Sequence, residues 1–198
     1  MVKIRSMNHV SEGVLSAIGN TPIVRLTHVL ADIHFKLYGK LEMLNPGGSI
    51  KDRTAISILW HGLDNGEIRP GSVVVESTSG NMGIGLAQAC LLLELRFVCV
   101  VDPKTTEQNI RILKAYGAEI DLVSEPDPNT GEYLQARINR VKYLLRTINH
   151  SFWPNQYANA YNPKAHHRTM HEIVTQLDGK LDYLFCATST CGTMRGCA

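Results

Sequence analysis

The chain has 198 residues, of which 44% are hydrophobic and 19% are charged. This length suits one large domain or two small ones, and the composition is that of an ordinary globular protein. Basic and acidic residues number 20 and 18, for a net charge of +2. The charge therefore gives no reason to expect nucleic acid or an acidic membrane surface as a partner.

The sequence shows no targeting or membrane-spanning pattern. Residues 1–10 carry positive charges but lack the apolar stretch of a secretory signal. The most apolar run, residues 89–101, is interrupted by Glu94 and Arg96 and is too short to cross a bilayer. The five cysteines form no CxxC pair. These observations predict a reduced, cytoplasmic protein.

Strand and helix patterns alternate along most of the chain. Short apolar strands are predicted at residues 73–76, 96–102, 119–124 and 181–189. Apolar residues at helical spacing predict helices at residues 79–95, 105–118, 132–147 and 162–177, and another that begins near Gly192. Thr105 or Thr106 is the expected cap of the second helix, and Gly117 its end. This alternation predicts an α/β fold with a parallel sheet.

Three loops rich in small and hydroxyl residues lie at predicted helix starts. They read NPGGSIKD (45–52), ESTSGN (76–81) and ATSTCGT (187–193). A helix N-terminus offers unpaired N–H groups and the positive end of a dipole, which suits anions. The loops together therefore predict one site for a ligand with several anionic groups. Taken singly, each loop is also compatible with ordinary caps and turns, and Lys51 with a solvated lysine.

Together these loops resemble the fold-type II family of pyridoxal-phosphate enzymes, which includes cysteine synthase and cystathionine β-synthase. NPGGSIKDR (45–53) is similar to the family's N-P-x-x-S-x-K-D-R, which implies that Lys51 forms the Schiff base with pyridoxal 5′-phosphate. ESTSGNMGI (76–84) is similar to the family's T-S-G-N-T-G loop, which implies that Asn81 also bonds the cofactor's ring hydroxyl. The resemblance implies that this loop holds the substrate carboxylate through Thr78, Ser79, Gly80, Asn81 and Met82.

Three further segments extend the resemblance, which runs from about residue 12 to the end. ATSTCGT takes the place of the family's G-T-G-G-T phosphate cup. This implies phosphate contacts from Ser189, Thr190, Cys191, Gly192 and Thr193. NQYAN (155–159) is similar to the segment whose glutamine faces the substrate carboxylate, here Gln156, and GNTPIVRL (19–26) to the family's opening strand.

The resemblance also implies an architecture. It is a two-domain, tryptophan synthase β-like α/β fold with parallel or mixed sheets flanked by helices, assembled as a homodimer. Residues 1–47 and 153–198 would form part of the larger cofactor-binding domain, and residues 48–152 the smaller, mobile domain. The chain stops as a helix begins. We therefore expect a C-terminally truncated chain, with the Ser or Thr beside the pyridine nitrogen lying beyond Ala198.

Departures from the family's motifs bear on the substrate. Met82 stands where sulfur-assimilating members have Thr, and the phosphate cup reads STCGT. The segments together are most similar to siderophore-pathway enzymes that join O-phospho-L-serine to L-glutamate. Their product, N-(2-amino-2-carboxyethyl)-L-glutamate, is a precursor of 2,3-diaminopropionate. Two alternatives stay open: a cysteine synthase that uses sulfide, and a non-catalytic remnant that binds an amino acid or a partner.

Anionic substrates need fixed cations or many hydrogen-bond donors. Arg137 and Tyr157 are the candidate substrate contacts, although a solvated helix arginine and a packing tyrosine are the ordinary interpretations of the two. Asp52 is expected to cap the helix after Lys51, and Arg53 to brace the loop through a carboxylate.

Histidines gather on one predicted helix, at His166, His167 and His171, and the last two have an i,i+4 spacing that can bind a metal. No H-E-x-x-H motif is present and no cysteine lies nearby in the sequence. A solvated helix face is therefore the preferred interpretation, and no metal is predicted.

Overall fold

The computed structural model describes residues 13–27 and 34–198. Its main sheet has four parallel strands in the order β5-β4-β3-β6. A separate antiparallel pair is formed by β1 and β2. The strands are β1 (Ile23–Arg25), β2 (Tyr38–Lys40), β3 (Val73–Ser77), β4 (Arg96–Val101), β5 (Glu119–Leu122) and β6 (Ser151–Phe152). The predicted α/β fold with a parallel sheet is confirmed.

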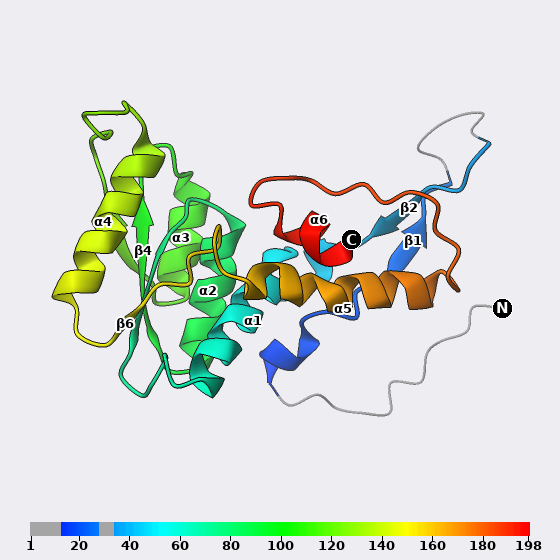
Figure 1. The fold of residues 1–198 in the computed structure, drawn as a ribbon, viewed down its shortest axis with the longest axis horizontal. Helices are drawn as coiled ribbons and strands as arrows, with labels where there is room; N and C mark the ends of the chain where they lie inside the picture. The colour runs from blue at the N-terminus through cyan, green and yellow to red at the C-terminus, as the bar shows by residue number, and fades with distance from the viewer. Residues whose placement is uncertain (1–12, 28–33) are drawn as a thin grey trace.

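Helices cover both faces of the main sheet. Figure 1 shows α4 on one face and α2 and α3 on the other, with α1 packed against α2, while α5 leads away toward β1 and β2. The helices are α1 (Lys51–Asp64), α2 (Asn81–Leu92), α3 (Glu107–Ala115), α4 (Tyr133–Thr147), α5 (Tyr161–Gln176) and α6 (Gly192–Cys197), with 3-10 turns η1 (Val14–Ala17) and η2 (Glu42–Leu44). Within the described ranges, none of these helices has the length and apolarity needed to cross a bilayer.

Alternate residues of the central strands enter two separate apolar cores. Val74 and Cys99 belong to the core that includes residues of α1, α2 and α3. Val75 and Val100 face the other way and pack with Val141 of α4. Successive side chains of a strand point to opposite faces. Burial on both faces explains why these strands read as unbroken apolar runs in the sequence.

The strand predicted at residues 181–189 is wrong. The segment has no regular secondary structure, and the side chains of Tyr183 and Phe185 are 80% and 89% exposed. An apolar run becomes a strand only when a neighbouring strand satisfies its backbone N–H and C=O groups. Within residues 13–27 and 34–198, no strand pairs with this segment.

The ends of two helices test the predicted caps. Thr106, not Thr105, caps α3, since its Oγ1 accepts the Asn109 N–H at 3.3 Å. Gly117 follows the helix with φ +79°, as predicted for a helix end. The prediction that Asp52 caps α1 is wrong. The helix begins at Lys51, and Asp52 Oδ2 accepts the Gly47 N–H at 2.5 Å, which folds the preceding turn back onto the helix.

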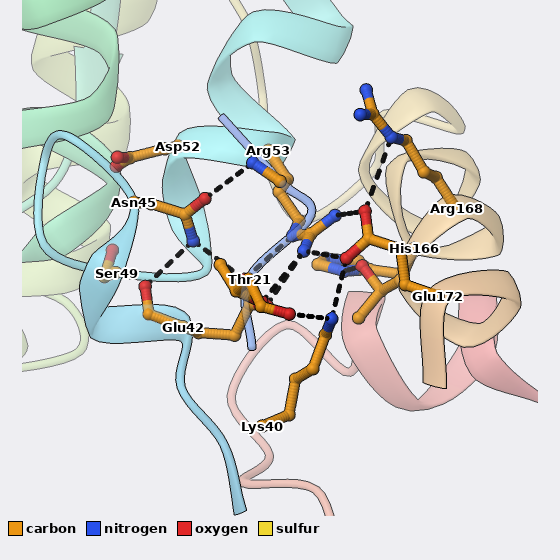
Figure 2. Close-up of polar contacts among 12 residues, drawn as sticks. Thr21, Lys40, Glu42, Asn45, Ser49, Asp52, Arg53, His166, Arg168 and Glu172 are labelled. Atoms are coloured by element: carbon orange, nitrogen blue, oxygen red, sulfur yellow. Dashed lines mark hydrogen bonds and ion pairs between the residues drawn. The ribbon is translucent and has the colours of Figure 1, made fainter. Parts of the chain in front are cut away.

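Arg53 is the centre of a buried ion cluster that joins η2, α1 and α5 (Figure 2). It is 4% exposed and donates to both oxygens of Glu42, at 2.8 and 2.9 Å. It also donates to both oxygens of Glu172, at 2.8 and 2.7 Å. Lys40 Nζ adds an ion pair to Glu172 at 2.8 Å. The prediction that Arg53 braces the loop through a carboxylate is confirmed.

The cluster holds Glu172 in its ionised form. Burial by itself would raise the pKa of this carboxyl group. Hydrogen bonds from Arg53, Lys40 and the Asn20 N–H outweigh burial and lower the pKa to about 2 from an ordinary 4.5. Asn45, the first residue of the NPGG turn, joins the cluster because its amide donates to Glu42 Oε2 at 2.8 Å. The turn before Lys51 is therefore tied to the same charges.

We expect Glu172→Gln to destabilise the fold strongly, because it leaves Arg53 and Lys40 buried with too little countercharge. Breaking one partner of a buried ion pair costs roughly 3–5 kcal/mol of unfolding free energy. Urea denaturation at pH 7 measures the loss. Glu119→Gln is the control, because it breaks an exposed pair with Arg96, and such pairs contribute about 0–1 kcal/mol. Equal losses in the two variants would contradict the expectation.

The stabilisation by Glu172 should also depend on pH. A carboxyl group whose pKa is lowered on folding contributes its full stabilisation above the unfolded pKa, here 4.5, and loses it as the pH falls toward the folded value of about 2. The wild-type chain should therefore lose stability over this interval more steeply than Glu172→Gln. Urea titrations at a series of pH values compare the two slopes, and parallel curves would refute the assignment.

Candidate active site

Lys51 lies in the first turn of α1, directly after the NPGGS turn. Gly48 has φ +83°, a conformation that favours glycine, and the Lys51 N–H donates to Ser49 Oγ at 3.1 Å. In the described part of the chain, the Lys51 ammonium has no hydrogen-bond or ion-pair partner. Burial lowers the pKa of Lys51. A lysine with a lowered pKa is more readily neutral, and the neutral amine is the form that attacks a carbonyl carbon.

Residues 78–82, called the carboxylate loop below because they are predicted to hold the substrate carboxylate, follow the carboxyl end of β3 and include the first two residues of α2. Thr78 is buried and its Oγ1 accepts the Gly80 N–H at 3.3 Å, while the Asn109 amide donates to the Ser79 carbonyl at 2.9 Å. A Cβ built on Gly80 would meet no atom within 4 Å, so open space adjoins the loop. The buried hydroxyl of Ser77 has no hydrogen-bond partner within residues 13–27 and 34–198. The loop is thus held by the hydrogen bond from Asn109 and adjoins open space at Gly80.

Asn81 and Met82, the first two residues of α2, differ in their exposure to solvent. Asn81 is exposed, so its amide can reach a ligand. Met82 is 2% exposed and belongs to the hydrophobic core, so its side chain supports the loop from within. Further along α2, a Cβ on Gly85 would lie 3.2 Å from both the Lys51 carbonyl oxygen and Ala55 Cβ. Through this close approach, α2 packs directly on the first turn of α1, next to the backbone of Lys51.

Glu76 fastens the Gln156 segment to the sheet. β6 ends at Phe152, and Pro154 has no N–H with which to continue the pairing with β3. The buried Glu76 carboxylate instead accepts the Trp153 indole N–H at 3.1 Å and the Gln156 N–H at 3.2 Å. Burial raises the pKa of Glu76 to about 7 against the opposing effect of these donors. Gln156 is thereby held beside the carboxylate loop, and it is itself buried.

The proposed phosphate cup is a tight turn that leads into α6. Cys191 has φ +58°, and the Gly192 N–H donates to Thr190 Oγ1 at 3.3 Å. A Cβ on Gly192 would lie 2.1 Å from Asn162 Oδ1, so only glycine fits there. Ser189 and Cys191 are exposed, whereas Thr190 and Thr193 are partly buried. The turn offers hydroxyl groups and N–H groups of a first helical turn, a donor set that suits a phosphate.

Two buried residues of α5, Asn162 and His166, escaped the sequence-based prediction. His166 Nε2 lies 3.2 Å from Thr54 Oγ1 and 3.4 Å from Thr193 Oγ1. Burial, with the charges of Lys51 and Arg53, lowers the pKa of His166 to about 4, so the ring is neutral at pH 7. The solvated face predicted for the three histidines is wrong for His166.

The other two histidines, His167 and His171, are exposed. The sequence signal for the buried face was the spacing of Asn162, His166, Thr169 and Ile173, which share one side of a helix and are all buried. Within residues 13–27 and 34–198, no three His, Cys, Asp or Glu side chains gather closely enough to hold a metal ion.

A pocket of about 440 Å³ adjoins the carboxylate loop at Ser79. Lys104, Arg137, Asp102 and Glu132 also line it, so it carries charges of both signs. Arg137 Nε lies 3.1 Å from Asp102 Oδ2, while the buried Arg137 Nη1 has no hydrogen-bond partner among the residues that the structure describes. The structure therefore brings Arg137 to the carboxylate loop.

Tyr157, the other predicted substrate contact, does not line this pocket, and its side chain is 52% exposed. The remaining groups together fit pyridoxal phosphate in their chemistry. Lys51 supplies an amine of lowered pKa, the turn at residues 189–193 supplies phosphate donors, and Asn81 supplies an exposed amide. The roles of the individual residues stay predictions.

Known proteins resemble the chain in sequence and in fold. The profile of a family described as "Pyridoxal-phosphate dependent enzyme" matches residues 14–198. A hydrogen sulfide-producing enzyme from Fusobacterium nucleatum has 33% identity and a TM-score of 0.89, over 96% of this chain and 61% of that one. A cysteine synthase from Entamoeba histolytica has 32% identity and a TM-score of 0.87, over 100% and 59%.

An O-ureido-L-serine synthase also has 32% identity and a TM-score of 0.87, over 96% of this chain and 58% of that one. The chain thus spans about three fifths of the length of these solved structures. The family profile covers nearly all of the chain and includes each of the loops described above. The chain belongs to the family of pyridoxal-phosphate dependent enzymes.

Proposed function

We propose that the protein is a pyridoxal-phosphate dependent enzyme of the cysteine synthase type, which replaces the β-substituent of an activated serine. The observation that carries this proposal is the desolvated Lys51 amine at the start of α1, directly after the NPGGS turn. When bound, the cofactor would supply an electron sink for carbanion chemistry at the substrate α-carbon. The chain supplies the groups that bind and orient.

Each loop has a task in this proposal. Ser189–Thr193 hold the phosphate, and the loop at residues 78–81, with Gln156, holds the substrate carboxylate. Once substrate is bound, Lys51 Nζ moves the proton of the substrate α-carbon, and its lowered pKa suits a base that works near neutral pH. Movement of residues 48–152 as a smaller domain would close the loop over the substrate and exclude water.

The co-substrate that we propose is L-glutamate, with O-phospho-L-serine as the activated serine, giving N-(2-amino-2-carboxyethyl)-L-glutamate. The pocket beside Ser79 supports an amino-acid nucleophile because it carries both signs of charge. Lys104 and the unpartnered Arg137 Nη1 suit carboxylates, and Asp102 and Glu132 suit an ammonium group. Sulfide would use none of these groups.

Cysteine synthase is the second candidate. It is favoured by the 32% identity to the Entamoeba histolytica cysteine synthase over the whole of this chain. The two candidates share the Lys51 chemistry. They differ in the nucleophile, and a cysteine synthase would take O-acetylserine or O-phosphoserine as the activated serine. Product analysis with each of these two serines, given glutamate in one reaction and sulfide in another, separates the candidates.

Lys51→Ala should abolish covalent capture of pyridoxal phosphate. We expect borohydride treatment of the wild-type protein with the cofactor to leave one pyridoxyl group on the peptide that contains Lys51, because burial lowers the pKa of this amine and it directly follows one of the loops. Mass spectrometry of the digested protein measures it. Lys104→Ala, which removes an exposed lysine of the pocket, should still be labelled at Lys51. Labelling spread over surface lysines would oppose the proposal.

Arg137→Met should raise KM for glutamate by about 10- to 100-fold, since a hydrogen bond to a charged group contributes roughly 1.5–3 kcal/mol. The rate with sulfide should stay unchanged, because sulfide makes no carboxylate contact. Arg140→Met is the matched control on the same helix. Arg140 pairs with Asp121 and does not line the pocket. If both arginine variants affect glutamate equally, or if sulfide is the preferred nucleophile, the glutamate assignment is wrong.

A further inference from the structure

We infer that Asn162 is a positioning residue that holds the phosphate cup and the Gln156 segment at fixed places relative to α1, an inference that rests on the proposed function. Asn162 lies in the first turn of α5 and is 2% exposed. It contacts three segments that are far apart in the sequence. No motif singled it out, and it touches none of the reacting atoms in the proposed chemistry.

One amide group serves the two ligand-binding segments. Asn162 Nδ2 donates to the Gln156 carbonyl oxygen at 2.7 Å and to Thr190 Oγ1 at 2.9 Å. Both N–H donors of the amide are thus engaged, one toward each segment. Thr190 in turn accepts the Gly192 N–H at 3.3 Å, so the shape of the turn follows the position of Asn162.

The amide oxygen of Asn162 connects this residue to α1, the helix that begins at Lys51. Thr54, three residues after Lys51, donates its hydroxyl to Asn162 Oδ1 at 3.3 Å. Thr54 is fully buried, and its hydroxyl also contacts His166, which reaches Thr193. Side-chain hydrogen bonds of two α5 residues, Asn162 and His166, therefore link the first turn of α1 to the phosphate cup.

The packing around Asn162 is as restrictive as its hydrogen bonds. A Cβ on Gly192 would lie 2.1 Å from Asn162 Oδ1, and a Cβ on Gly196 would lie 2.0 Å from the Pro163 carbonyl oxygen. These two glycines let α6 lie directly on the start of α5. The side chain of Asn162 consequently fills a space of fixed size. A substitution that keeps its shape but removes its N–H donors therefore separates the contribution of its hydrogen bonds from that of its packing.

Asn162→Asp is that substitution, because aspartate has the shape of asparagine but no amide N–H. We expect hydrogen–deuterium exchange of the chain without cofactor to rise about fivefold in peptides covering residues 155–157 and 189–193. The reason is that each segment loses a buried hydrogen bond that contributes roughly 1 kcal/mol. Ser72→Ala is the control, since Ser72 is equally buried but bonds the Arg69 N–H at the other end of β3.

Thr190→Val tests the same idea with little risk to the core, because Thr190 is only partly buried. It removes one Asn162 contact and keeps the other, so exchange should rise in residues 189–193 and stay unchanged in residues 155–157. The inference would be overturned if exchange in Asn162→Asp rose in neither segment. It would also be overturned if Ser72→Ala showed the same rise in residues 155–157 and 189–193. A rise spread evenly over the whole chain, which indicates general destabilisation, would overturn it as well.

Ligand titrations then separate this inference from the proposed function. In the wild-type protein, pyridoxal phosphate should bind more tightly than pyridoxal, which lacks the phosphate. Asn162→Leu, which removes the N–H donors without adding a negative charge beside the phosphate, should reduce that preference by about tenfold, with little change in the affinity for pyridoxal. An undiminished preference in Asn162→Leu overturns the inference while the proposed function stands. A wild-type protein that binds neither ligand contradicts the proposed function, and the exchange measurements still decide the role of Asn162.

Discussion

The placement of the candidate site depends on the buried ion cluster of Arg53. Burying a guanidinium group is expensive unless its donors are matched by carboxylates in good geometry. Glu42 and Glu172 supply that match, each through both oxygens. Because Arg53 follows Lys51 by two residues, the cluster fixes the start of α1 against η2 and α5 (Figure 2). The position of the Lys51 amine thus depends on Glu172, which lies 119 positions after Arg53 in the sequence.

A second constraint is that the loops of the candidate site are held by buried or half-buried polar side chains of other elements. Glu76 on β3 holds the Gln156 segment, Asn109 on α3 holds the carboxylate loop, and Asn162 on α5 holds the phosphate cup. Loops cannot satisfy their own backbone groups as helices do, so these contacts supply the missing partners. The arrangement leaves one side of the loops exposed. The geometry of the loops therefore depends on the helices and strands that hold them.

Local patterns predicted much of this fold. The helices at α2, α3, α4 and α5 follow from apolar spacing and caps, and the buried strands β3 and β4 from short apolar runs. The same rule failed at residues 181–189, because an apolar run has no means of showing whether a partner strand exists. It failed again at His166, where burial comes from the packing of α1 and α6 on α5. Both errors concern neighbours that are remote in the sequence.

The sequence by itself determined the α/β class and singled out three candidate ligand loops and Lys51, because these predictions rest on residue types at short spacing. The tertiary structure decided how those loops meet. It paired Arg53 with Glu172, set Asn162 between two loops and brought Arg137 to Ser79. Charges and hydrogen bonds act over a few ångströms of space whatever their separation along the chain. For this reason only the folded arrangement shows which polar residues serve the site.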